Sequence, residues 1–164
     1  MNYFENIGKF KENVALITEK EKFTYNSIIN FSQKILKGLK ERSLILIRCS
    51  NCFEVLLAYI SFNRINCAII LVEDSLVNNP YIEIINAYQP DYIFQKKNKK
   101  IDNINYTSFN TFGSHEILKR KNKDNLVINE NLSLLIPTSG SMGSPKFVRY
   151  SYENIHTNIN QVTE

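Results

Sequence analysis

The sequence predicts an α/β fold with a mostly parallel sheet and helices on both of its faces. Short apolar runs alternate along the chain with longer stretches whose apolar residues recur every three or four positions. The run Cys67–Val72 is apolar throughout, as in a strand covered on both faces. Strands that alternate with helices in this way form parallel sheets. At 164 residues, the chain has the size of one domain with a single core.

The first half of the chain predicts a hairpin followed by helices and strands in alternation. Asn51 is expected to cap the second helix, with Glu54 as its capping-box partner. In chain order, the expected elements are strands Val14–Thr18 and Phe23–Tyr25, helix Asn26–Glu41, strand Leu44–Arg48, the helix after Asn51, and strand Cys67–Val72. The residues expected on the buried helix faces are Ile28, Phe31, Ile35 and Leu39, then Phe53, Leu56, Leu57 and Ile60.

The second half predicts a third helix, three strands and a fourth helix. Pro80 suits the first turn of a helix that buries Tyr81, Ile84, Ile85 and Tyr88. The stretch Gln95–Lys123 is polar and basic, and it predicts only a connection. The remaining expected elements are strands Tyr92–Phe94, Leu132–Thr138 and Lys146–Ser151, then helix Glu153–Glu164 with Ile155, Ile159 and Val162 inward.

Composition excludes several classes of protein. The net charge of +4 arises from 20 basic and 16 acidic residues, and the basic clusters around Lys96–Lys100 and Lys119–Lys123 are interpreted as solvated loops. Because these clusters are not interleaved with aromatic residues on one face, no nucleic-acid partner is expected. No apolar stretch approaches the ~20 residues that span a bilayer. The amino-terminal residues do not resemble a secretory signal, so a cytoplasmic protein is expected.

The cysteines and histidines give only a weak metal or redox signal. Cys49 and Cys52 have the spacing of a redox or metal pair, but Cys67, His115 and His156 lie in no recognisable ligand spacing. Three reduced cysteines at strand ends and on a buried helix face are the preferred interpretation. A surface or helix-face position is expected for both histidines. No metal-binding residue is therefore assigned.

The stretch Leu134–Ser151, LLIPTSGSMGSPKFVRYS, carries the main functional signal. Small residues allow backbone N–H groups to approach an anion, hydroxyls add donors, and a lysine adds a positive charge. The spacing is not that of a Walker loop, because Ser144-Pro145 precedes Lys146 and Phe147 follows it. It is also not the dinucleotide pattern GxGxxG, which opens a helix directly. The stretch therefore predicts a phosphate-binding loop of another kind, between two strands.

Thr138–Val148 resembles the phosphate-binding signature of the adenylate-forming, AMP-binding ligases, which include acyl-CoA synthetases, adenylation domains and luciferases. The family pattern is Thr-Ser-Gly-Ser/Thr-Thr/Ser-Gly-x-Pro-Lys-x-Val, followed shortly by Ser-His/Tyr-x-Asn, which Ser151–Asn154 completes. Weaker similarity to the family covers Thr24-Tyr25, the stretch Leu44–Leu71 and Gln89–Ile93.

The resemblance implies that residues 1–164 form a single partial domain, the amino-terminal portion of an AMP-binding ligase. The full-length reaction would join a carboxylate to the α-phosphate of ATP and pass the acyl group to coenzyme A or to a pantetheine carrier protein. Magnesium would take part, but its ligands and the catalytic groups are expected outside this chain. The residues expected to bind ATP phosphates are Thr138, Ser139, Gly140, Ser141, Gly143 and Lys146.

Two positions depart from the family pattern. Met142 removes one hydroxyl, and Phe147 replaces a frequent glycine, which is expected to change strand packing more than chemistry. The leading hypothesis is an amino-terminal portion that does not turn over substrate alone. The alternatives are a self-standing nucleotide-binding or interaction module, and a non-catalytic remnant that associates through an exposed apolar surface.

Overall fold

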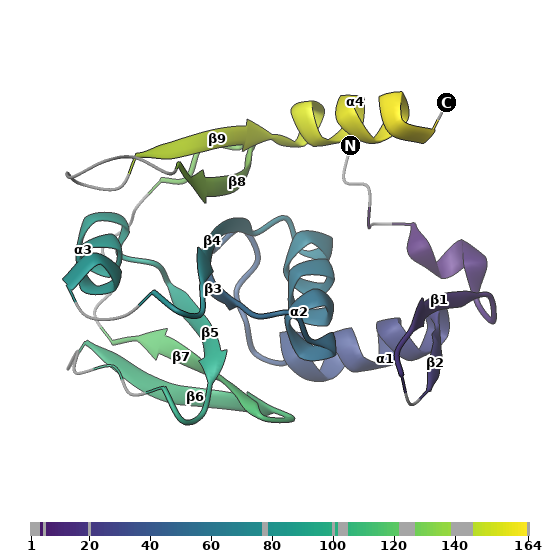
Figure 1. Ribbon diagram of the computed structural model, residues 1–164, viewed down its shortest axis with the longest axis horizontal. Helices are drawn as coiled ribbons and strands as arrows, with labels where there is room; N and C mark the ends of the chain where they lie inside the picture. Colours follow the sequence, from purple (N-terminus) through teal and green to yellow (C-terminus); the bar gives the residue numbers. More distant parts are fainter. Residues whose placement is uncertain are drawn as a thin grey trace.

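The computed structural model describes residues 4, 6–19, 21–76, 79–99, 101, 105–121, 127–138 and 146–163. Helices and strands alternate through most of this chain (Figure 1). In chain order the elements are η1 (Ile7–Phe10), β1 (Val14–Ile17), β2 (Lys22–Thr24), α1 (Tyr25–Leu36), β3 (Leu44–Cys49), α2 (Phe53–Arg64), β4 (Ala68–Glu73), α3 (Asn79–Tyr88), β5 (Tyr92–Lys96), β6 (Tyr106–Phe112), β7 (His115–Arg120), β8 (Leu132–Pro137), β9 (Phe147–Ser151) and α4 (Tyr152–Thr163).

The main sheet has seven strands in the order β6-β7-β5-β3-β4-β8-β9, and β1 pairs with β2 in a separate hairpin. The central strands β5, β3, β4 and β8 are parallel to their neighbours in this group. At one edge β7 and β6 run antiparallel, and at the other edge β9 is antiparallel to β8. The predicted α/β class is thus confirmed, with a parallel centre and antiparallel edges.

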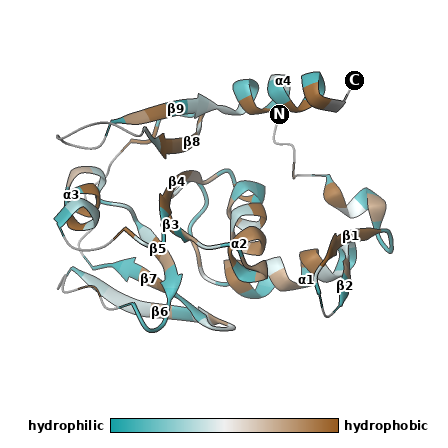
Figure 2. Cartoon of the chain, in the orientation of Figure 1, coloured by the Kyte–Doolittle hydropathy of each residue, from teal (hydrophilic) through white to brown (hydrophobic). Residues whose placement is uncertain are grey.

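The helices cover both faces of this sheet, as predicted. Side chains alternate along β3, so that Ile45 and Ile47 join the core cluster beneath α1 and α2, whereas Leu46 joins the cluster beneath α3. Figure 1 shows α3 on the opposite side of the central strands from α1 and α2. Brown segments in Figure 2 mark hydrophobic residues along β8 and on the helices. Burial on two faces explains the continuous apolar runs in the central strands.

The first half follows the predicted pattern, with changes at both helices. Thr24 caps α1 by accepting a hydrogen bond from the Ser27 amide at 3.2 Å. The helix ends at Leu36, earlier than expected, and Gly38 follows with a φ of 77°. The expected Asn51 cap is wrong, because Cys52 is the N-cap of α2 and makes no side-chain capping bond.

The buried face of α2 also differs from the prediction. Leu56 was expected inside, but it is 41% exposed. Buried positions instead include Val55, Leu57, Ala58 and Phe62. Phe62 lies edge-on to Phe94 of β5, with ring centroids 6.1 Å apart. The helix is therefore rotated relative to the orientation that the spacing of apolar residues suggested.

The polar stretch Gln95–Lys123 contains a hairpin that the sequence did not predict. β6 and β7 pair in antiparallel register, and β7 adds to the sheet beside β5. On β6, Ser108, Asn110 and Thr111 interrupt the hydrophobic pattern, because this strand forms the sheet edge. Part of the expected solvated basic loop is therefore strand, and Arg120 within it is buried.

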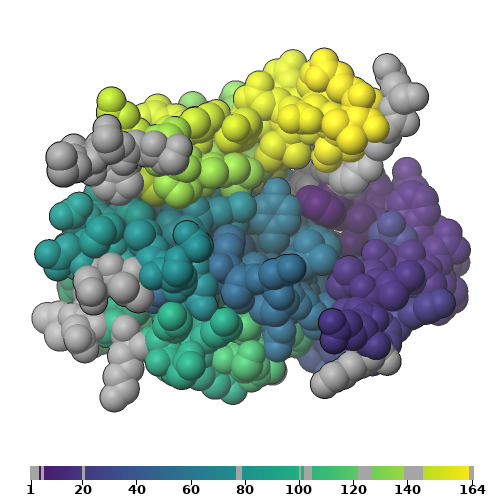
Figure 3. Space-filling view, viewed as in Figure 1, coloured from purple at the N-terminus to yellow at the C-terminus, as the bar shows by residue number. Residues whose placement is uncertain are grey.

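The strand β9 and the helix α4 form the opposite edge of the molecule. Figure 3 shows them as a yellow-green to yellow band along one side of the molecule. Ile155 is half-buried against the core, but Val162, expected inward, is 79% exposed. Among the described residues, none of the helices combines the length and the hydrophobicity needed to cross a bilayer.

Candidate functional site

The two strands on either side of the predicted phosphate loop form an antiparallel pair, the β8–β9 frame. β8 is joined to the sheet centre through Ile69 and Ile70 of β4, and β9 pairs with β8 as far as Phe147 opposite Pro137. Beyond this pair, the Thr138 amide donates to the Lys146 carbonyl at 2.8 Å, and the Thr138 hydroxyl reaches the same oxygen at 3.2 Å. The frame therefore fixes both ends of the intervening segment close together.

Of the six predicted phosphate-binding residues, Thr138 and Lys146 lie in the described part of the chain. Both are exposed at the ends of the strands. No salt bridge among the described residues involves Lys146. The other predicted residues lie outside the described residues; they are Ser139, Gly140, Ser141 and Gly143.

The Ser-x-x-Asn end of the sequence pattern has a structural role in this chain. The Asn154 side-chain oxygen accepts from the Ser151 amide at 3.0 Å, and the Asn154 amide donates to the Ser151 hydroxyl at 3.0 Å. This reciprocal arrangement is a capping box at the start of α4. It joins β9 directly to α4 and sets the direction in which the helix leaves the strand.

Arg42 fixes the other end of the β8–β9 frame. Its guanidinium donates to the carbonyls of Asn66 at 2.6 Å, of Leu132 at 3.0 Å, and of Asn129. It also reaches the Tyr152 hydroxyl at 3.4 Å, and that hydroxyl contacts the carbonyl of Cys67 at 3.2 Å. One side chain therefore links the turn before β3 to β4, β8 and α4. No sequence pattern predicts this role, since three of the four acceptors are main-chain carbonyls.

Phe147, which was expected to change strand packing, contacts α3. Its ring meets that of Tyr88 at 4.9 Å between centroids, with an interplanar angle of 66°. Along β9, Arg149 is exposed while Tyr150 packs against the core, in agreement with the alternation expected in a strand. The loop frame is therefore supported by both adjoining layers.

Two hollows lie away from the ends of the loop. One, of about 540 Å³, is lined by the end of α3, by residues 127–132 and by β9. The other, of about 1040 Å³, lies between the β1–β2 hairpin and the start of α2. Neither is lined by Thr138 or Lys146.

A charged cluster forms where the central strands end. Asp74 meets Lys96 at 3.0 Å, Arg48 at 3.5 Å and Lys99 at 3.8 Å. Arg48 is buried, and its guanidinium stacks 4.2 Å from the Tyr81 ring. Burial alone would raise the pKa of Asp74, but the hydrogen bond from Lys96 and the nearby cations outweigh it and lower the pKa. Lys96 and Lys99 thus have a structural partner, contrary to the solvated loop expected from the sequence.

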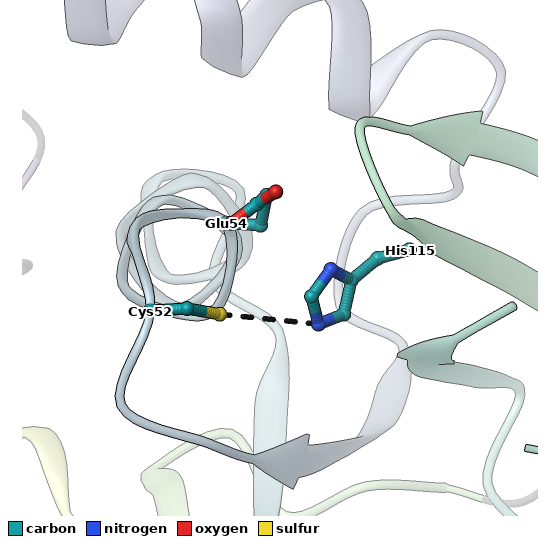
Figure 4. A group of neighbouring side chains, drawn as sticks. All are labelled: Cys52, Glu54 and His115. Atoms are coloured by element: carbon teal, nitrogen blue, oxygen red, sulfur yellow. Dashed lines mark hydrogen bonds between the residues drawn. The ribbon is translucent and has the colours of Figure 1, made fainter. Parts of the chain in front are cut away.

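His115 differs most from its expected position. It is only 1% exposed, on β7, with its ring stacked on Phe94 at 4.9 Å. Its Nε2 lies 4.0 Å from Cys52 Sγ, and Glu54 is adjacent (Figure 4). Burial lowers the pKa of His115. Burial would raise the pKa of Glu54, but backbone and side-chain hydrogen bonds and the nearby imidazole lower it. All three cysteines are free, as predicted.

Known proteins share both the sequence pattern and the fold. The family model described as "AMP-binding enzyme" matches residues 3–164. No curated protein matches the sequence closely enough to count as a relative. Among solved structures, Bacillus subtilis O-succinylbenzoate coenzyme A synthetase (MenE) in complex with AMP superposes with a TM-score of 0.72 at 14% identity, over 98% of this chain and 45% of that one.

Two further solved structures show the same fold. The Klebsiella oxytoca NpsA N-terminal subdomain, in complex with 3-hydroxyanthranilyl-AMSN, gives a TM-score of 0.60 at 20% identity, over 91% of this chain and 39% of that one. VinN in complex with L-aspartate superposes with a TM-score of 0.65 at 16% identity, over 97% of this chain and 50% of that one. This chain therefore spans half or less of the solved chains that it matches. By the match of the family model to residues 3–164, the chain belongs to the AMP-binding enzyme family.

Proposed function

We propose that residues 1–164 supply the ATP-phosphate-binding portion of an adenylate-forming ligase that activates a carboxylate as an acyl-AMP. The observation that carries the proposal is the β8–β9 frame, which brings Thr138 and Lys146 together at the two ends of the signature loop. Membership of the AMP-binding family supports the use of an adenine nucleotide. The complexes of MenE with AMP and of NpsA with an acyl-AMP analogue favour the same chemistry.

The proposed reaction makes one electrostatic demand on this part of the enzyme. A carboxylate oxygen attacks the α-phosphorus of ATP, the bond to the bridging oxygen breaks, and pyrophosphate leaves with the bonding electrons. Negative charge therefore grows on the β- and γ-phosphates as the bond breaks. The exposed Lys146 ammonium can stabilise that charge, together with the amides and hydroxyls of the loop. The Thr138 hydroxyl can add a donor once it turns from the Lys146 carbonyl toward a phosphate.

Lys146 is suited to this role because it has no competing partner among the described salt bridges. Its carbonyl is held by Thr138, so the backbone that carries the ammonium is fixed while the side chain projects into solvent. With its backbone anchored, only the lysine side chain has to lose conformational freedom when an anion binds, which costs about 0.5–1.5 kcal/mol. Magnesium and the acyl acceptor, coenzyme A or a pantetheine carrier, would then be bound by groups outside this chain.

The proposal can be tested by titrating the chain with ATP. Lys146→Ala should weaken ATP binding by about 10- to 100-fold, as expected for the loss of one ionic contact to a phosphate. The matched control is Lys97→Ala, because Lys97 is also exposed but lies on the β5–β6 connection. Equal affinity of Lys146→Ala and the control would contradict the assigned role. Absence of ATP binding by the unmodified chain would instead identify a non-catalytic remnant.

A second measurement separates a portion of an enzyme from a complete one. Carboxylate-dependent exchange of labelled pyrophosphate into ATP requires the whole adenylation site. We expect no exchange from residues 1–164 alone, even where ATP binds. Exchange at a measurable rate would show that the essential groups are all present in this chain.

A further inference from the structure

Three side chains of different chemistry converge between the start of α2 and the start of β7. They are Cys52, Glu54 and His115, and one ligand atom from each lies within 4.8 Å of the other two. Figure 4 shows the sulfur of Cys52, the N-cap of α2, directed at the ring of His115, with Glu54 beside it on the first turn of the helix. His115 is buried, whereas the other two are partly exposed. Cys52 and Glu54 also help to line the larger hollow, the one between the β1–β2 hairpin and the start of α2.

The hydrogen bonds in this cluster determine which nitrogen of His115 is free. An ionised Glu54 can only accept, so the Ser114 hydroxyl, 3.3 Å from its Oε1, donates to it. That hydroxyl must then accept from His115 Nδ1, which lies 3.1 Å away. The neutral ring therefore has its lone pair on Nε2, the atom that faces Cys52 Sγ at 4.0 Å. This is the tautomer that a metal ligand requires.

We propose that Cys52, Glu54 and His115 bind a divalent transition-metal ion, with Zn²⁺ as the best match. Thiolate, imidazole and carboxylate are the three protein ligands that zinc uses. The 4.0 Å between Sγ and Nε2 exceeds the separation expected for two ligands on one tetrahedral zinc ion by only a few tenths of an ångström. The separations that involve Glu54 are within 4.8 Å, at most about 1.4 Å beyond the tetrahedral value, so the Glu54 side chain would have to turn toward the ion. With three protein ligands, the fourth position would hold water.

The scaffold around the cluster supports such a site. The ring of His115 is held against Phe94 with an interplanar angle of 4°, and its Nδ1 is held by Ser114. Gly113, with a φ of 55°, lets the β6–β7 turn approach Glu54, because a Cβ there would lie 2.9 Å from Glu54 Oε1. An outer hydrogen bond and a fixed ring are the features that orient histidine ligands.

Binding changes the protonation of one group. The Cys52 S–H bond breaks, the proton leaves to solvent, and the thiolate forms a bond to the metal. No electron transfer takes place, so the step balances with the release of one proton per ion. None of the three residues belongs to the predicted phosphate loop, so the inference does not depend on the proposed ATP binding.

Cobalt titration of the full chain provides the test, because Co²⁺ reports a thiolate ligand by its absorption spectrum. We expect one equivalent to give a thiolate-to-cobalt charge-transfer band and tetrahedral visible bands, both removed by Zn²⁺. Cys52→Ser should abolish the charge-transfer band. The matched control, Cys49→Ser, changes a neighbouring cysteine outside the cluster and should retain it. Circular dichroism of each variant checks that the fold is intact.

Ser114→Ala tests the outer hydrogen bond without removing a ligand. It should lower zinc affinity by about 10- to 100-fold, as loss of an outer-shell partner does. His115→Gln should lose the visible tetrahedral bands. The proposal is overturned if excess Co²⁺ gives no charge-transfer band with the unmodified chain, if Cys52→Ser keeps the band, or if Cys49→Ser loses it.

Discussion

Replacing Arg42 should destabilise the whole β8–β9 frame, because this side chain joins four segments of the chain. Its guanidinium donates to three main-chain carbonyls, those of Asn66, Asn129 and Leu132. Hydrogen bonds with one charged partner contribute ~1.5–3 kcal/mol each when buried. Arg42 is only half-buried, so water can replace part of each bond. At about 1 kcal/mol per bond, Arg42→Ala should lower the free energy of unfolding by about 3 kcal/mol.

The backbone at Arg42 allows the side-chain effect to be separated from strain. Its φ of 53° lies in the left-handed region, which costs most residues ~1–2 kcal/mol but suits asparagine. Arg42→Asn removes the same guanidinium while relieving that strain. It should therefore be about 1 kcal/mol less destabilising than Arg42→Ala. The difference between the unfolding free energies of the two variants measures the backbone strain at position 42, which the contacts of Arg42 overcome in the wild-type chain.

Urea unfolding followed by circular dichroism measures the lost side-chain contacts and the backbone strain. Each variant should shift the urea concentration at the midpoint while the dependence of the unfolding free energy on urea stays constant. Arg149→Ala is the control, because Arg149 is exposed on β9, and its loss should cost less than about 0.5 kcal/mol. An Arg42→Ala variant as stable as this control would refute the assigned role. Equal stabilities of Arg42→Ala and Arg42→Asn would refute the argument from backbone strain.

The remaining predictions concern the α4 cap and the Asp74 cluster. Ser151→Ala should destabilise the start of α4 by about 1 kcal/mol and raise amide hydrogen exchange there, while ATP affinity stays unchanged. A loss of ATP affinity with unchanged amide exchange would instead indicate that Ser151 contacts the ligand. Since the pKa of Asp74 is lowered in the folded state, its ionic contribution is present above the unfolded pKa and is lost as pH falls below about 4. Asp74→Asn should flatten that acid dependence in urea titrations, and an unchanged pH profile would contradict this assignment.

The core of the fold was predictable because it depends on short-range patterns. β3 and β4 form apolar runs that only a sheet covered on both faces explains, and α3 begins with a proline that suits a first helical turn. The hairpin β6–β7 was missed because its outer strand lies at a sheet edge. An edge strand buries little, so polar residues such as Asn110 and Thr111 replace the alternating pattern that would reveal it.

Errors in the helices have a different cause. Helical spacing defines an apolar face but not its exact rotation, which tertiary packing decides. In α2, Phe62 packs against Phe94, and Leu56 turns outward. The capping box predicted at Asn51 and Glu54 failed because Glu54 is bound to Ser114 of a distant turn. The local capping motif was thus overridden by a contact between residues 60 positions apart, which a motif of four neighbouring residues does not reveal.

The two candidate sites differ in predictability because they are assembled differently. A phosphate loop uses consecutive backbone amides, so its residues are contiguous and its pattern survives in the sequence. The metal cluster depends on sheet pairing: Lys96 of β5 lies opposite His115 of β7, and Ile47 of β3 lies opposite Phe94. These two registers place His115 over the end of β3, where the chain turns into α2 at Cys52. Ligands 63 residues apart thus become neighbours through an edge hairpin that itself has no sequence signal.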